Sequence, residues 1–265
     1  MKYKFVTNSK NVQQDAIFSE YEQELANGIL TFIEQSYAAY GIQFPNKVLL
    51  IVKEPTASNP KFCLGNKNNC KNDFIIVASN KLNYWCQAMY QISHEMTHAI
   101  IQYNSSSKTE SISWIEETIC EAMSLFFLKQ AIINWEFIKP QTFGQSYKES
   151  IVEYLNNLLL EKGTNELANS KSVEELQRIN DSSQDNRNTR KNEMHELFLR
   201  LDGDNINGLI NYRKYILRKT ILLNTKKYKT AFYGNQAVTY LCNLQDNIVS
   251  QRTAKLNSIK SILTI

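Results

Sequence analysis

The spacing of apolar residues along the chain predicts long amphipathic helices around a short stretch of strands. Over residues 15–40, apolar side chains recur every three or four positions and the pattern stops at Gly41, which predicts a first helix. The runs KVLLIV (47–52) and DFIIVAS (73–79) are short and rich in β-branched residues, as strands of one sheet are. A helical pattern over residues 83–103 follows the second run closely. This order of elements predicts an α+β fold with a small sheet.

The helix predicted over residues 83–103 has two unlike faces. His94 and His98 lie on the side flanked by glutamines, and the opposite side is an apolar stripe about 100° wide. The stripe consists of Trp85, Met89, Ile92, Met96, Ile100 and Tyr103. Because the stripe is the face that packs on a core, we expect the two histidines to line a cleft rather than to be ordinary core residues.

The rest of the chain is predicted to be helical. ISWIEETICEAMSLFFLKQAII and KESIVEYLNNLLLEK have helical periodicity, and residues 163–192 are largely polar. EMHELFLRL, INGLINYRKYILRKTILL and the stretch after Ala231 predict three further helices. We therefore expect an α+β domain over residues 1–160, a linker or mobile loop over 161–192 and a helical C-terminal lobe over 193–265.

Charge is unevenly distributed along the chain. The 265 residues carry a net charge of only +4, which is too small to imply a nucleic-acid partner. From Arg187 to the last residue, however, there are 14 Lys and Arg against 5 Asp and Glu. A solvated basic helical surface explains this surplus, and a surface that binds an acidic protein or a nucleic acid remains an alternative.

Composition also indicates where the protein is found. The first residues lack the apolar run of a signal peptide, and no stretch approaches 18 uncharged apolar residues. The cysteines are odd in number and unevenly spaced, at positions Cys63, Cys70, Cys86, Cys120 and Cys242. This usage suits a reducing compartment, so we expect a cytoplasmic protein that makes no use of membranes. Cys63 and Cys70 could pair only if the chain were exported.

The stretch QISHEMTHAIIQ contains a candidate metal site. It places His94, Glu95 and His98 in the order His-Glu-x-x-His, and the chain has only 3 histidines in all. Helix positions four apart are separated by about 40° around the axis, so both imidazoles can bind one metal ion. Glu95 lies beside them and is placed to accept a proton from a metal-activated water.

Glu117 is a candidate third ligand. There are 18 residues between His98 and Glu117, enough for a helix end, a loop and an antiparallel return. A site of two histidines, one glutamate and a water is typical of catalytic zinc. Glu121, one turn further on, could accept the ring N–H of a ligand histidine. The alternative is that both glutamates belong to a solvated acidic face.

Over residues 74–128 the sequence resembles the gluzincin superfamily of zinc metallopeptidases. The resemblance rests on HEMTH, the 18-residue gap and WIEETICEA. Aminopeptidase N-like members have a segment Trp-Leu-Asn-Glu-Gly-Phe-Ala that aligns with residues 114–120 and puts Glu117 at the ligand position. Thermolysin-like members have an acidic residue of the outer coordination shell where this chain has Glu121. The resemblance implies a zincin-like catalytic domain with a mixed sheet, an edge strand and two active-site helices, followed by a helical lobe.

The chain also departs from these families. It has no Gly-x-Met-Glu-Asn segment, and Glu116 and Thr118 stand where aminopeptidases have Asn and Gly, so exopeptidase action is not supported. The histidine of the metzincin extension is missing. Thermolysin-like enzymes stabilise the oxyanion with a downstream histidine and aminopeptidases with a tyrosine. His195, Tyr147 and Tyr154 are therefore alternatives for this role.

Taken together, the sequence predicts a Zn²⁺-dependent peptidase. His94, His98 and Glu117 would bind the metal, Glu95 would act as general base, and the edge strand before the motif helix would align a peptide or protein substrate. One alternative is a regulatory or binding module that keeps the fold and uses its basic C-terminal region to hold a protein or nucleic acid. A zinc hydrolase of non-peptide amides is a third.

Overall fold

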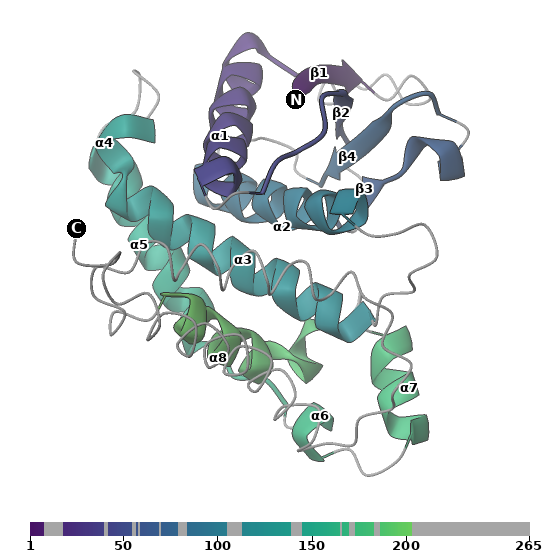
Figure 1. The fold of residues 1–265 in the computed structure, drawn as a ribbon. Coiled ribbons are helices and arrows are strands. Elements are labelled where there is room, and N and C mark those ends of the chain that lie inside the picture. The colour runs from purple at the N-terminus through teal and green to yellow at the C-terminus, as the bar shows by residue number, and fades with distance from the viewer. Residues whose placement is uncertain are drawn as a thin grey trace, which may run out of the picture. The chain divides into compact units, whose positions relative to one another are not determined.

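The computed structural model in Figure 1 describes most of the N-terminal three-quarters of the chain. The described residues are 1–7, 18–39, 42–54, 57, 59–68, 70–78, 84–104, 113–138, 145–164, 166–169, 173–182 and 186–202. They fold into two compact units. The first contains residues 1–38, 42–103 and 123–160, and the second contains the described residues among 104–122 and from Glu161 onward.

The first unit is built on a four-stranded mixed sheet with the order β1-β2-β4-β3. Strands β1 (Lys2–Thr7), β2 (Val48–Lys53) and β4 (Asp73–Val77) are parallel, and β3 (Lys61–Cys63) is antiparallel to β4. Alternate residues of β2 and β4 are fully buried, which is the period of two that a sheet packed on one face requires. The α+β prediction and both predicted strands are confirmed.

The sheet contains two strands that we did not predict, and these are its edges. β1 lies outside β2, and β3 lies outside β4. The strand that leads into the motif helix, β4, is therefore paired on both sides, and the prediction that it is an edge strand is wrong. The chain turns from β3 to β4 through the short helix η2 (Gly65–Asn68). A Cβ atom on Gly65 would lie 2.4 Å from the carbonyl oxygen of Asn72, so this turn requires glycine.

Helix α1 (Glu20–Ala39) begins with a capping box. The hydroxyl of Ser19 accepts the backbone N–H of Glu22 at 3.2 Å, and Glu22 Oε2 accepts the backbone N–H of Ser19 at 2.9 Å. The start that we predicted, at residue 15, lies outside the described residues. The second carboxylate oxygen of Glu22 accepts from Lys53 of β2 at 2.8 Å, which ties the helix to the sheet.

Helix α2 (Trp85–Asn104) is the predicted motif helix, and it packs against several neighbours in the first unit. The hydroxyls of Tyr37 in α1 and Thr97 in α2 are 2.7 Å apart and buried. Trp85 meets Trp135 of α4 (Trp135–Ile138) edge to face, and Tyr90 meets Tyr154 of α5 (Gln145–Leu160) in the same way. These contacts fix α2 beside the sheet, in the arrangement that Figure 1 shows.

Helix α3 (Ser113–Ile133) is the second predicted long helix. Its first residues, to Ala122, belong to the second unit and its remaining residues to the first. In the first unit, the ring of Phe127 packs edge to face on Phe32 and Tyr37 of α1, with centroids 6.2 and 5.2 Å away.

The described residues of the second unit from Glu161 onward form four further helical elements. These are α6 (Glu166–Asn169), α7 (Val173–Asp181), η3 (Arg187–Thr189) and α8 (Lys191–Asp202). The helix predicted over EMHELFLRL is confirmed as α8, whose Met194, Leu197, Phe198 and Leu201 are buried. The two later predicted helices lie outside the described residues, and the predicted domain boundaries stay predictions. Within the described chain, no helix is long and apolar enough to span a membrane.

Candidate metal centre

The motif helix is buried on more sides than the helical wheel predicted. The expected stripe residues Trp85, Met89, Ile92, Met96 and Ile100 are at most 3% exposed, and His94 and Glu95 on the other side are only 4% and 3% exposed. Polar side chains on the remaining face donate hydrogen bonds to backbone carbonyls of the same helix. Ser93 donates to the carbonyl of Met89 at 2.6 Å, for example. His94 is therefore buried, whereas His98 is half-buried.

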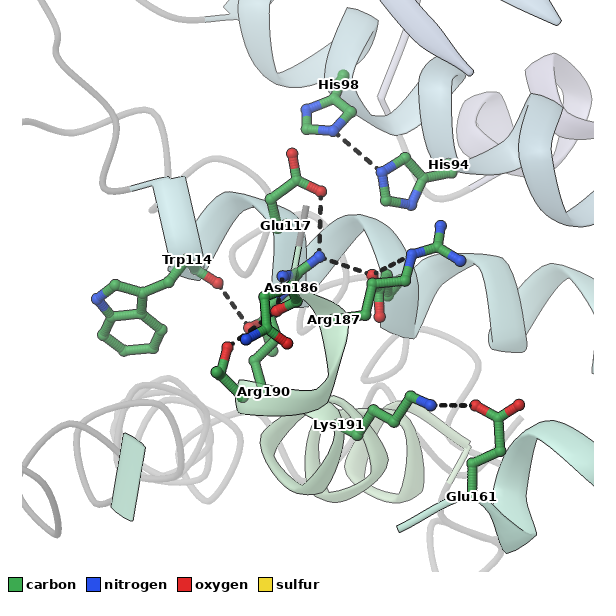
Figure 2. A network of polar contacts seen from close by, with 12 residues as sticks. His94, His98, Trp114, Glu117, Glu161, Asn186, Arg187, Arg190 and Lys191 are labelled. Carbon is green, nitrogen blue, oxygen red and sulfur yellow. Dashed lines mark hydrogen bonds and ion pairs between the residues drawn. The ribbon is translucent and has the colours of Figure 1, made fainter. Parts of the chain in front are cut away.

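The two histidine side chains meet each other. Their Nε2 atoms are 3.2 Å apart and their ring centroids 4.9 Å apart, because His94 and His98 project from consecutive turns of α2. Figure 2 shows the two rings facing one another. Two imidazole nitrogens bound to one tetrahedral zinc at about 2.0–2.1 Å must lie about 3.3 Å apart. The observed spacing fits that requirement without a change of rotamer.

Glu117 of α3 joins this pair. One ligand atom from each of His94, His98 and Glu117 lies within 4.8 Å of the other two, and the Glu117 side chain is buried. The structure thus brings together the three residues that the spacing of the motif predicted as ligands. It also excludes the alternative that the glutamates form a solvated acidic face, since Glu117 is 7% exposed and Glu121 is 1% exposed.

The chemistry of the three donors fits zinc. Two imidazole nitrogens and one carboxylate oxygen form the donor set of catalytic zinc sites, in which a fourth position is left for water or substrate. Hard ions such as Mg²⁺ and Ca²⁺ are bound by oxygen atoms and do not select paired imidazoles. His94, His98 and Glu117 therefore form a group that could hold a metal ion, compatible with a His-Glu-x-x-His…Glu zinc site.

Glu95 lies between the ligand histidines in the sequence and close to the edge of the sheet. Burial is the main cause that raises the pKa of the Cys63 thiol, and the charge of Glu95 raises it further. Cys63 is the last residue of β3, so the carboxylate of Glu95 is within electrostatic range of this edge strand.

Glu121 has cationic partners that sequence reasoning did not find. Its Oε1 atom accepts from Arg190 Nη2 at 2.7 Å and from Arg187 Nε at 3.1 Å. Arg190 also reaches Glu117 Oε2 at 3.5 Å, as the dashed lines in Figure 2 show. Arg187 and Arg190 follow a polar stretch and carry no periodic pattern, so nothing in the sequence marked them. The predicted bond from Glu121 to a ligand histidine stays a prediction.

The three candidates for an oxyanion stabiliser have different surroundings. Tyr147 hydrogen-bonds with Tyr21, whose pKa is raised chiefly by burial and then by Tyr147. Tyr154 packs on Tyr90, one turn before His94 on α2, with ring centroids 6.2 Å apart. His195 is a partly exposed residue of α8 in the second unit. Among the two tyrosines, Tyr154 is the one packed on the motif helix.

The comparisons with known proteins add no relative. No family model, no curated protein and no solved structure matches the chain.

Proposed function

We propose that this protein is a zinc-dependent metallopeptidase. The observation that carries the proposal is the spacing of His94 and His98, whose Nε2 atoms are 3.2 Å apart and share a metal-ligand group with Glu117. The sequence adds Glu95 next to the first ligand. A zinc ion in such a group lowers the pKa of a coordinated water and polarises a substrate carbonyl. This combination of ligands and base favours hydrolysis over a structural metal.

Glu95 would move the proton in this reaction. Its carboxylate accepts a proton from the water that attacks the peptide carbonyl, and it delivers the same proton to the nitrogen of the leaving amine. The side chain is 3% exposed, so bulk water competes little for it. A neutral amide at this position could neither accept the proton nor deliver it.

The substrate would bind along β3. β4, the strand next to the motif helix, is paired on both sides. This leaves β3 as the edge strand on that side of the sheet. An extended peptide can add to such an edge through backbone hydrogen bonds.

A peptide-library digest that compares three proteins tests the proposal. The native chain should cleave within peptides, Glu95→Gln should lose cleavage by a factor of at least 10² while it keeps its zinc, and Glu24→Gln should behave as the native chain. Glu24 is an exposed residue of α1, so its variant is a matched loss of one negative charge. Cleavage that survives in Glu95→Gln would contradict the proposed mechanism.

One alternative is favoured by a specific observation. The chain from Arg187 onward has 14 Lys and Arg against 5 Asp and Glu, which suits a binding module that holds an acidic protein or a nucleic acid. Retention on nucleic acid that falls with salt and is unaffected by Glu95→Gln would favour this alternative. Most of that region lies beyond the described residues.

A zinc hydrolase acting on a non-peptide amide would appear in the digest as zinc binding without cleavage.

A further inference from the structure

The helix that carries Glu117 presents a second carboxylate to the same region. Glu121 lies one turn further along α3, on the same face, and both side chains are almost completely buried. Like charges four residues apart on a helix repel one another, and burial makes this repulsion stronger. Two such carboxylates need cations, and either of them is chemically able to bind a metal ion.

Arg190 contacts both carboxylates. Its side chain is 1% exposed, and its Nη2 atom is 2.7 Å from Glu121 Oε1 but 3.5 Å from Glu117 Oε2. The shorter contact is a charge-assisted hydrogen bond of ordinary length, and the longer one is at the limit for a hydrogen bond. Arg187 adds a contact of 3.1 Å to the same Oε1 atom of Glu121. Both arginines therefore act mainly on Glu121.

The turn before α8 holds the Arg190 guanidinium in place. Its Nη1 atom donates to the carbonyl oxygen of Asn186 at 3.2 Å, and the backbone N–H of Arg190 donates to the carbonyl of Arg187 at 3.2 Å. The carbonyl oxygen of Arg190 in turn accepts from Met194 in the first turn of α8. Because the guanidinium is planar and its Nη1 atom is held by Asn186, its Nη2 atom can donate in one direction only.

We propose that Arg190, supported by Arg187, withholds Glu121 from the metal, so that Glu117 alone supplies the carboxylate ligand from α3. The inference rests on the proposed zinc site. Arg190 is then a positioning residue that acts through Glu121. Its role is to keep the site at two nitrogens and one oxygen, because a second carboxylate would fill the position that a catalytic site leaves for water. An added oxygen ligand would also favour ions such as Mn²⁺.

The test uses Arg190→Gln in the full chain, with Lys191→Gln as its matched control. Lys191 is the next residue and carries the same charge, but it pairs with Glu161 rather than with α3. We measure zinc affinity by chelator competition and the visible absorption spectrum of the Co²⁺-substituted protein. We expect Arg190→Gln to bind zinc at least about tenfold more tightly, because Glu121 becomes an additional ligand. For the same reason we expect the Co²⁺-substituted variant to absorb visible light more weakly. For Lys191→Gln we expect both readouts to match the native chain.

A double variant separates this role from simple loss of structure. Arg190→Gln combined with Glu121→Gln removes the carboxylate that Arg190 restrains, so affinity and Co²⁺ spectrum should return to native values. Arg190→Lys keeps the charge and checks that the chain still folds. The inference is wrong if Arg190→Gln has the zinc affinity and the Co²⁺ spectrum of the native chain. It is also wrong if the double variant does not return to the native affinity and spectrum. Failure of the proposed function would look different, since the native chain would either take up no zinc or bind zinc without cleaving peptides.

Discussion

His94 and His98 present their Nε2 atoms to one another at 3.2 Å from consecutive turns of a buried helix. Side chains this close usually share a ligand or a proton, and here a third donor, Glu117, belongs to the same group. The helix is fixed by contacts made elsewhere, such as the hydroxyl pair of Tyr37 and Thr97. The geometry of the histidine pair is therefore set by the fold of the first unit before any ion binds.

The buried ion pair between Glu22 and Lys53 is predicted to contribute strongly to stability. Both side chains are nearly inaccessible, at 7% and 4% exposure, and their charged atoms are 2.8 Å apart. Lys53→Met leaves the Glu22 carboxylate buried without its ion pair, which should lower the free energy of unfolding by about 3–5 kcal/mol. Urea denaturation measures this loss.

A second variant identifies its cause. Adding Glu22→Gln to Lys53→Met removes the uncompensated charge but keeps an oxygen that can accept from Ser19, as it does in the capping box. The double variant should recover much of the lost stability. A double variant that is no more stable than Lys53→Met would show that packing, rather than charge, explains the effect.

The pH dependence of stability should contain a contribution from Glu193. This carboxyl is 4% exposed, and burial raises its pKa from the ordinary value of 4.5 to about 7. The folded protein therefore holds this proton more tightly than the unfolded chain does. The stabilisation is complete below pH 4.5 and is lost as the pH rises to about 7, a change of roughly 3 kcal/mol.

Glu193→Gln isolates that contribution. Because the amide cannot ionise, the variant should be more stable than the native chain above pH 7, and the difference should shrink as the pH falls towards 4.5. Denaturant midpoints at a series of pH values measure it. A difference that does not vary with pH would contradict the role of burial in raising this pKa.

The thiols of Cys63 and Cys70 should react at very different rates. Cys70 is exposed, whereas Cys63 is buried and its pKa is raised by burial, so it has little thiolate at neutral pH. Brief alkylation of the native protein at pH 7, followed by mass spectrometry, should label Cys70 and spare Cys63. Unfolded protein is the control, in which both label. Equal labelling in the native state would mean that the Cys63 thiol is accessible rather than buried.

The sequence predicted the helices and the grouping of His94, His98 and Glu117 better than the sheet. The 3.6-residue period of α2 and α3 extends over 20 and 21 residues, so both helices and the shared face of Glu117 and Glu121 could be found from spacing alone. β3 has only 3 residues in a polar segment, too few for a period of two to be recognised. Its existence depends on pairing with β4, which no local pattern records.

The same reason explains why the arginines were missed. Arg190 and Glu121 are 69 residues apart in the chain, and Arg190 comes from a stretch whose polar composition is typical of a solvated surface. The burial of its side chain follows from tertiary packing around α3 and α8. Sequence periodicity reports which face of a helix is apolar, but it does not report which distant cation compensates a buried carboxylate.

The measurement that tests the metal site most directly is the zinc content of the purified chain. After removal of bound metal and reloading, the native protein should retain one zinc ion per chain, and the variant His94→Ala, His98→Ala, Glu117→Ala should retain none. Elemental analysis of both proteins, with circular dichroism to confirm that each is folded, gives the result. Equal zinc content in the two folded proteins would contradict the assignment of these three residues as the metal ligands.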